Sequence, residues 1–392
     1  MNNTTPILIK NAKLFCENKM INNGHLLIEQ GLISAIFSEQ PNLTELPNYV
    51  RIVDGTNLNL IPGFIDGHIH GAAGADVMDA TEEALDTMAN VLPEEGTTSF
   101  LATTITHSPE NIEKALRNVA VYKSKLGKAE VIGVHLEGPF IEKSKKGAQP
   151  VEYILEPTIE QFKEWQNTSG NKIMTITMAP EHDADGSFIK YVSQTGVNVS
   201  AGHTGTNFEG IKNAIKHGLS QVTHLCNAMT GIHHRDIGVV GAALRLKEIR
   251  AELIADGIHV SKEMMQLIYN NMGSERLLLI TDSMRAKCLH AGDYELGGQA
   301  VTVTHDRAVL DDGTLAGSIL KMYQGAQQML ALDDVSIQHI INMASINPAK
   351  QVGIYEKKGS LKVGKDADML LVDDELNIKY TFCRGHIAYE VK

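Results

Sequence analysis

Apolar and polar positions follow a hairpin pattern in the first part of the chain. Over residues 7–53, short apolar stretches such as 7–9 and 32–36 are separated by Asn-Gly and Gln-Gly pairs. Such pairs are typical of tight turns between antiparallel strands, and helical periodicity is absent from this region of the sequence. The pattern predicts a small β domain.

From residue 61 onward, apolar runs suited to buried strands alternate with amphipathic stretches of helical periodicity, such as 81–92 and 261–272. This alternation predicts a parallel sheet with crossover helices. Each repeat of roughly 20 to 40 residues has room for a strand, a helix and two loops. Eight strands, the number of a (β/α)8 barrel, are predicted at residues 64–70, 97–104, 131–137, 173–179, 197–203, 221–224, 250–259 and 277–282.

Strand-like segments return near the end of the chain, after β character at residues 294–303 and helices near 319–332 and 337–344. They are predicted at 359–363, 369–372 and 378–383. The simplest architecture pairs them with the N-terminal strands. The predicted fold is therefore α/β, with a (β/α)8 TIM-type barrel over 61–358 and a small β-sandwich domain formed by 1–60 and 359–392.

The length of the chain is consistent with a barrel and an accessory domain, and its net charge limits the classes of partner. The 392 residues exceed the roughly 250 of a barrel and leave room for one accessory domain. A net charge of −12 disfavours nucleic acid or an anionic membrane as partner, so any phosphate site needs a local cationic pocket. The N-terminus lacks a signal-peptide pattern, no apolar run suits a membrane helix, and the four cysteines lack paired spacing. We expect a cytoplasmic protein with free thiols.

Five of the predicted strands end in a potential metal ligand. His68 and His70 are two residues apart on a strand, so their side chains share a face and can hold one cation. A His-x-His pair also occurs by chance at strand ends. Here, however, it follows Pro62-Gly63 and closes the first predicted barrel strand, which favours the metal interpretation.

Glu137, His203 and His224 close the third, fifth and sixth predicted strands. A carboxylate at the end of an apolar strand is costly to bury unless a positive charge compensates it, and a metal can do so. Alternatively, Glu137 is a solvated carboxylate at a loop start, and single histidines of this kind are usually structural. The joint placement favours a metal site. His135 shares the strand face of Glu137 but is not predicted to be a ligand.

Asp282 closes the eighth predicted strand, where its carboxylate would face the metal site. It can act as general base toward water and then as general acid toward a leaving amine. The alternative role is an N-cap of the following segment.

The motifs together resemble the amidohydrolase superfamily and, within it, the family of N-acetylglucosamine-6-phosphate deacetylases, over nearly the whole chain. The motifs are Pro62-Gly63-Phe64-Ile65-Asp66-Gly67-His68-Ile69-His70-Gly71, His135-Leu136-Glu137-Gly138-Pro139-Phe140, Ala201-Gly202-His203-Thr204, Thr223-His224-Leu225-Cys226-Asn227-Ala228-Met229, Ala255-Asp256-Gly257-Ile258-His259, Thr314-Leu315-Ala316-Gly317-Ser318 and Gly364-Lys365-Asp366-Ala367-Asp368-Met369.

The resemblance implies hydrolysis of the N-acetyl group of N-acetylglucosamine 6-phosphate, in amino sugar catabolism and cell-wall sugar recycling. It also implies that Glu137, His203 and His224 hold the principal divalent metal, and that His68 and His70 add a second with Glu137 bridging. We expect two metals per subunit, with zinc or iron favoured and manganese or cobalt also compatible.

The resemblance further implies a sugar-phosphate substrate and a homodimer, with Arg235 and His259 reaching into the neighbouring subunit's site. The remaining expected substrate contacts are Ala148, Gln149, Asn227, Ala228, Leu315, Ala316 and Gly317. One departure is Gln149, where many members carry a histidine; an amide cannot carry a proton. Lys143, Lys145 and Lys146 nearby are interpreted as a solvated loop face.

Two alternatives remain open at the level of the sequence. Another amidohydrolase activity, such as deacetylation of a galactosamine phosphate or opening of a cyclic amide, needs the same ligands and a different pocket. A non-catalytic sugar-phosphate sensor would be expected to have lost some of the ligands, and all six positions are intact.

Overall fold

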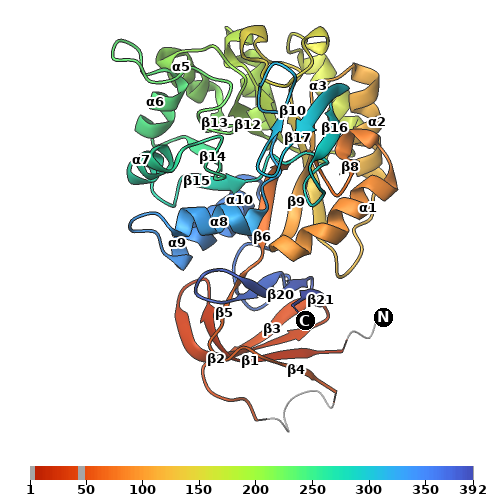
Figure 1. Ribbon diagram of the computed structural model, residues 1–392, viewed down its shortest axis with the longest axis vertical. Helices are drawn as coiled ribbons and strands as arrows, with labels where there is room; N and C mark the ends of the chain where they lie inside the picture. The colour runs from red at the N-terminus through yellow and green to blue at the C-terminus, as the bar shows by residue number, and fades with distance from the viewer. Residues whose placement is uncertain (1–4, 43–48, 392) are drawn as a thin grey trace.

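A computed structural model describes residues 5–42 and 49–391, which form two parts arranged along the long axis of the molecule. A parallel barrel surrounded by helices lies at one end, and a sheet built from both termini lies at the other (Figure 1). Within these residues, no helix combines the length and apolar character that crossing a bilayer requires.

The terminal segments form one connected sheet of eight described strands, in the order β21-β20-β19-β5-β1-β2-β3, with β4 also paired to β1. The N- and C-terminal halves meet where β5 pairs antiparallel with β19. A separate apolar cluster, which includes Leu14, Leu26 and Phe382, stabilises this sheet. Its strands are β1 (Ile7–Phe15), β2 (Met20–Glu29), β3 (Leu32–Phe37), β4 (Arg51–Asp54), β5 (Asn59–Pro62), β19 (Met369–Val372), β20 (Ile378–Cys383) and β21 (His386–Glu390).

The predicted strand at residues 359–363 is not present. Leu361 makes only an isolated bridge to Cys16, and Gly359 and Gly364 adopt positive φ angles of 85° and 91°. Turns on either side therefore leave too little extended backbone for a strand. The strand β21, which the sequence did not reveal, completes the sheet edge instead.

All eight predicted barrel strands are present in the described chain and run parallel in the order β15-β14-β13-β12-β11-β10-β9-β6. The barrel closes between β15 and β6, where the Asp282 N–H donates to the His68 carbonyl at 2.8 Å and the His70 N–H to the Ser283 carbonyl at 2.9 Å. The strands are β6 (Phe64–Ile69), β9 (Thr97–Thr104), β10 (Glu130–Glu137), β11 (Ile173–Met178), β12 (Asn198–Ala201), β13 (Leu219–Val222), β14 (Arg250–Ile254) and β15 (Leu277–Ile280).

Helices cover the outside of the barrel (Figure 1). Several begin at a side-chain N-cap, including Thr81, Asn207 and Ser261, because a cap oxygen satisfies an otherwise free N–H of the first turn. The helices are α1 (Glu82–Val91), α2 (Pro109–Val121), α3 (Ile159–Thr168), α4 (Ser187–Gln194), α5 (Phe208–His217), α6 (Gly238–Arg245), α7 (Lys262–Met272), α8 (Met322–Leu330), α9 (Ile337–Ile341) and α10 (Asn347–Gln351).

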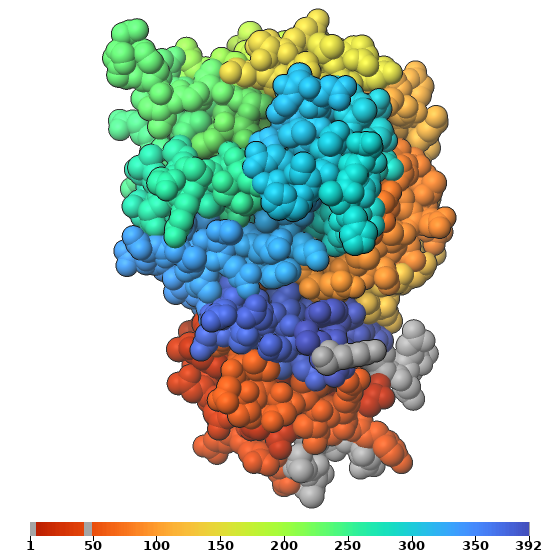
Figure 2. Space-filling view, in the orientation of Figure 1, coloured from red at the N-terminus to blue at the C-terminus, as the bar shows by residue number. Residues whose placement is uncertain are grey.

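A small antiparallel sheet follows the last barrel strand and packs on the outer end of the barrel. It consists of β16 (Gly292–Leu296), β17 (Gln299–Val303) and β18 (Ala308–Val309) in the described residues. Figure 2 shows this segment, in cyan to blue, as a raised block on the face of the barrel. Leu296, Val301 and Ala316 lie in its apolar core, so it forms one wall of the cavity described next.

Candidate metal centre and substrate cavity

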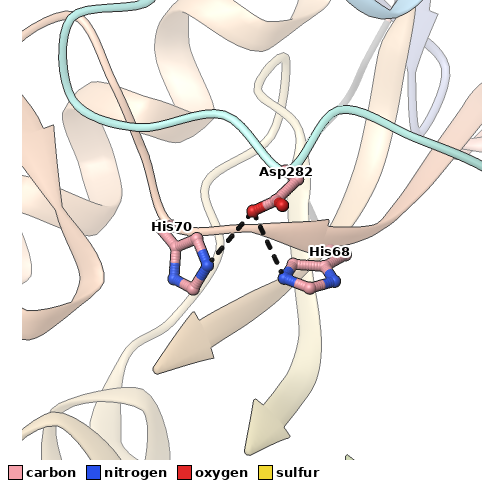
Figure 3. Close-up of side chains that lie close together, drawn as sticks. All are labelled: His68, His70 and Asp282. Carbon is pink, nitrogen blue, oxygen red and sulfur yellow. Dashed lines mark ion pairs between the residues drawn. The ribbon is translucent and has the colours of Figure 1, made fainter. Parts of the chain in front are cut away.

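The predicted ligands converge at the carboxyl end of the barrel strands. Figure 3 shows His68 and His70, from β6 and the residue after it, facing Asp282 after β15. Asp282 Oδ1 lies 3.4 Å from His68 Nε2 and 3.3 Å from His70 Nε2. This is the barrel end at which enzymes of this fold assemble their sites.

His203, His224 and Asp282 lie just beyond their strands, not within them as the sequence predicted. The strands end at Ala201, Val222 and Ile280, and the three residues adopt positive φ angles of 47°, 32° and 48°. This left-handed backbone costs of the order of 1–3 kcal/mol for a non-glycine residue and is typical of functional sites. Here it accompanies the convergence of these side chains on the barrel mouth.

Glu137 is the centre of the cluster, and its two carboxylate oxygens face different imidazoles. Its Oε1 lies 3.2 Å from both His203 Nε2 and His224 Nε2 and 3.5 Å from His68 Nε2. Its Oε2 lies 3.2 Å from His70 Nε2. Glu137 can therefore contact both pairs of histidines at once.

Two of these imidazoles are oriented by acceptors behind them. Glu252 Oε2 lies 3.0 Å from His68 Nδ1, and the Lys145 carbonyl oxygen lies 2.9 Å from His203 Nδ1. An acceptor on one ring nitrogen fixes the tautomer, so that the other nitrogen offers its lone pair to a metal.

The donor set fits a divalent cation. His203 Nε2, His224 Nε2 and Glu137 Oε1 are separated by 3.1–3.2 Å. These are close to the roughly 3.3 Å edges expected for ligands about 2.0 Å from one tetrahedral ion. His68 Nε2 is buried without a hydrogen-bond partner among the described residues, although it faces Glu137 and Asp282. Buried imidazole and carboxylate groups with unused lone pairs are what zinc, iron and related ions select.

The pKa values of the clustered side chains also favour a bound cation. Burial disfavours a charge on His70, but hydrogen bonds to Asp282 and Glu137 outweigh burial and raise the pKa of His70 to about 9. Burial also opposes ionisation of Asp282, yet His68 and His70 lower its pKa to about 2. The carboxylates are thus ionised, and their negative charge can be balanced either by protons on the histidines or by a metal. Metal binding would release the protons from the histidines.

His135 was not predicted to be a ligand, and both of its ring nitrogens face protein groups other than the Glu137 carboxylate. Its Nε2 lies 2.7 Å from Thr177 Oγ1 and its Nδ1 lies 3.1 Å from the Gly67 carbonyl oxygen. Burial, with an added effect of His68, lowers the pKa of His135 to about 4, so the ring is neutral. It packs against His68 at a ring distance of 4.5 Å and supports that ligand.

A cavity of about 320 Å³ opens above the cluster. Most of the predicted residues line it: His70, Glu137, Ala148, Gln149, His203, His224, Asn227, Ala228, His259, Asp282, Leu315 and Gly317. His68 lies deeper in the ligand cluster. Ala316 is fully buried in the core of the β16–β18 sheet, so the prediction that it lines the pocket is wrong.

Arg235 and His259 lie in different places. Arg235 is exposed on the loop of residues 231–236, outside the cavity, where its Nη1 contacts His234 Nε2 at 2.7 Å. His259 lines the cavity of its own chain, and its Nδ1 lies 2.6 Å from Asp256 Oδ2. The contact with Asp256 holds His259 in the cavity of its own chain, and a role of His259 in a neighbouring subunit's site stays a prediction.

Gln149 has both ends of its amide engaged. It donates to Glu137 Oε2 at 2.7 Å and accepts from the Thr106 N–H at 2.8 Å. The Thr106 donor fixes which end is oxygen, so the NH2 group must face Glu137. Gln149 therefore helps to orient the Glu137 carboxylate at the centre of the cluster.

Two residues near the centre were not predicted to act in the site. Glu252 is buried in β14 and also accepts from Gln221 Nε2 at 2.7 Å. A lone glutamate within the apolar run Ala251-Glu252-Leu253-Ile254 was the available signal. Lys145 lines the cavity instead of lying on a solvated face; its sequence context of several lysines gave no such signal.

Comparisons with known proteins agree with this geometry. The chain matches the amidohydrolase family over residues 59–388. It is 46% identical to an N-acetylglucosamine-6-phosphate deacetylase of Bacillus subtilis (98% of this chain, 97% of the relative) and 34% identical to an N-acetylgalactosamine-6-phosphate deacetylase of Escherichia coli O157:H7 (97% and 99%). The crystal structure of the Thermotoga maritima N-acetylglucosamine-6-phosphate deacetylase superposes with a TM-score of 0.87 at 30% identity, covering 98% of this chain and 100% of that one. The chain belongs to the amidohydrolase family.

Proposed function

We propose that this protein hydrolyses the N-acetyl group of N-acetyl-D-glucosamine 6-phosphate to D-glucosamine 6-phosphate and acetate, in amino sugar catabolism and cell-wall sugar recycling. The observation that carries the proposal is the set of four imidazoles around Glu137, with Asp282 beside it at the floor of an open cavity. The full-length similarity to deacetylases of this substrate supports the choice of sugar.

Glu137, His203 and His224 would hold the principal metal, and His68 and His70 would hold a second with Glu137 shared between them. When bound, a divalent ion supplies Lewis acidity, which lowers the pKa of water toward neutrality and polarises the acetamide carbonyl. Zinc and iron suit these ligands best, and manganese or cobalt are also compatible.

Asp282 is proposed to move the proton. Its carboxylate lines the cavity and its pKa of about 2 keeps it ionised, so it can accept a proton from the attacking water. The water oxygen bonds to the acetyl carbon, the carbon–nitrogen bond breaks, and Asp282 returns the proton to the departing sugar amine. Acetate and the free amino sugar are the products.

The rest of the cavity would hold the sugar phosphate. Leu315 and Gly317 would contact the sugar, and the turn at Asn227 and Ala228 would receive the phosphate. We further propose a homodimer in which the exposed Arg235 reaches the neighbouring subunit's cavity, since a guanidinium suits a phosphate dianion. The cytoplasmic location predicted from the sequence stays a prediction.

The direct test measures acetate released by the metal-reconstituted protein from N-acetylglucosamine 6-phosphate and from N-acetylglucosamine, with and without a chelator. We expect chelator-sensitive release from the phosphorylated sugar at a much higher rate. Absence of release from both sugars would contradict the proposed reaction, even with the metal bound.

N-acetylgalactosamine 6-phosphate is the second candidate substrate, because a relative named for its deacetylation matches 97% of this chain. The two sugars differ only in the orientation of one hydroxyl group. Parallel measurement of kcat/KM for both phosphates decides between them, and a higher value for the galactose isomer would reverse our choice.

A further inference from the structure

We propose that Lys145 is the cationic ligand that each chain supplies to the phosphate of its own substrate. This inference rests on the proposed function for the identity of the substrate. It gives a role to a residue that the sequence placed on a solvated loop face and that the structure places in the cavity wall.

Lys145 ends the 3-10 helix Lys143–Lys145, and its backbone is fixed on both sides. Its N–H donates to the Glu142 carbonyl at 2.9 Å, and its carbonyl oxygen faces His203 Nδ1 at 2.9 Å. The side chain therefore starts from a well-defined position directly beside a proposed metal ligand. It is half-buried, which limits the directions available to it.

The Lys145 ammonium has bonding capacity to spare. Within the described residues its one hydrogen bond is to the Met229 carbonyl, at a long 3.3 Å. Across residues 5–42 and 49–391, no carboxylate lies within 4.0 Å of its Nζ atom. An ammonium group has three donors, so an anion in the cavity can accept from it.

The Lys145 ammonium lies by the turn at which the phosphate is expected. Met229 directly follows the turn at Asn227 and Ala228, which lines the same cavity. The Asn227 N–H and side-chain amide already donate to the carbonyls of His224 and Leu225. Ala228 has a positive φ of 51°, and its N–H donates to no acceptor in the described chain. A free N–H and an ammonium that line the same cavity can both donate to a phosphate.

Charge balance shows why the cavity needs such a residue. Lys145 is the only lysine or arginine that lines the cavity in the described residues, whereas Glu137 and Asp282 contribute negative charge to its floor. The chain as a whole carries −12. Arg235 lies outside the cavity of its own chain, so in a single subunit the permanent positive charge for a dianion comes from Lys145.

The test compares K145Q, K145R and a matched control, K143Q, in the metal-reconstituted protein. Lys143 lies on the same 3-10 helix but is exposed and does not line the cavity. Calorimetry measures binding of glucosamine 6-phosphate, which needs no turnover, and acetate release gives kcat/KM for the phosphorylated and unphosphorylated N-acetyl sugars. Metal content is measured for every variant.

We expect K145Q to weaken glucosamine 6-phosphate binding and to lower kcat/KM for the phosphorylated sugar by about 10- to 100-fold, the range for a charge-assisted hydrogen bond. The unphosphorylated sugar should change by less than about 2-fold, because it lacks the group that Lys145 binds. K143Q should behave as wild type, and K145R should keep most of the affinity because it keeps the charge.

Equal losses for both sugars, or loss of metal in K145Q and K145R alike, would overturn the proposal and assign Lys145 to support of His203. Equal losses of binding and of kcat/KM in K145Q and K143Q would also overturn it. Such a result would mean that any nearby positive charge has the same effect, without direct contact to the phosphate. If the wild type binds glucosamine 6-phosphate in a Lys145-dependent manner but releases no acetate, the inference stands and the proposed reaction fails.

Discussion

In the described chain, a cluster of acidic side chains lies at each end of the barrel, and the negative charge is balanced in a different way at the two ends. At the carboxyl end, Glu137, Glu252 and Asp282 face imidazoles and no lysine or arginine within the described cluster. At the other end, Glu130, Asp366 and Asp368 surround the Lys358 ammonium at 2.6, 2.9 and 2.5 Å. Both arrangements place three or more possible ligands close together.

The difference favours the cluster at the carboxyl end of the strands as the metal site. The ammonium of Lys358 already occupies the centre of the second cluster, and there it joins Glu130 at the start of β10 to two residues that precede β19. Although Lys358 is buried, the three carboxylates outweigh this and raise its pKa, so it stays charged. Proximity of carboxylates alone is therefore weak evidence for a metal; the absence of a built-in cation is the informative feature.

The largest expected effect is at Asp282. D282N should lower kcat by about 10²- to 10⁴-fold, since the amide cannot accept or return the proton. Metal content should stay at the wild-type level if the five His and Glu ligands suffice. Steady-state acetate release together with metal analysis checks this, and a fully active D282N protein would remove Asp282 from the proposed mechanism.

Removal of the metal should destabilise the cluster at the carboxyl end of the barrel strands and leave the Lys358 cluster unchanged. At free metal about 1,000 times its dissociation constant, binding stabilises the folded chain by about 4 kcal/mol, and this is lost on chelation. Hydrogen exchange should show loosening at the carboxyl ends of β10, β12 and β13 but not around Lys358. Equal loosening at both ends would mean that both clusters depend on a metal.

K358M should lower the free energy of unfolding by about 3 kcal/mol, because three carboxylates lose their common cation. The raised pKa gives the pH dependence: the stabilisation by Lys358 is present below its unfolded pKa of about 10.4 and is lost as pH rises through the higher folded value. Urea unfolding of both proteins at pH 8 and pH 11 tests the sign: the difference in their free energies of unfolding should begin to decrease above the unfolded pKa, and a larger difference at pH 11 than at pH 8 would contradict it. Metal content should be unchanged in K358M.

The smallest expected effect is at Glu252, which acts through His68. E252Q keeps the shape but weakens the acceptor on His68 Nδ1, so metal affinity should fall about 10- to 100-fold, in the site formed by His68 and His70. Competition with a coloured chelator measures each affinity separately. H135Q is the matched control, since His135 contacts His68 without offering a ligand; a similar loss in H135Q would make packing, not the Glu252 acceptor, the cause.

The sequence by itself determined the fold class, the eight barrel strands and the six residues of the proposed centre. It could do so because strand patterning and strand-end placement are local properties, and a ligand at the end of a parallel strand must lie at the barrel mouth. Local signals failed at 359–363, where turns at Gly359 and Gly364 interrupt the extended backbone.

Only the tertiary structure decided what surrounds those ligands. Glu252 reaches His68 from a strand 184 residues away, and Gln149 reaches Glu137 from a loop. Lys145 and His259 lie in the cavity and Arg235 lies outside it, and no local pattern in the sequence separates these positions. Such roles depend on distances between segments remote along the chain, and these distances are set by the closure of the barrel rather than by any local pattern.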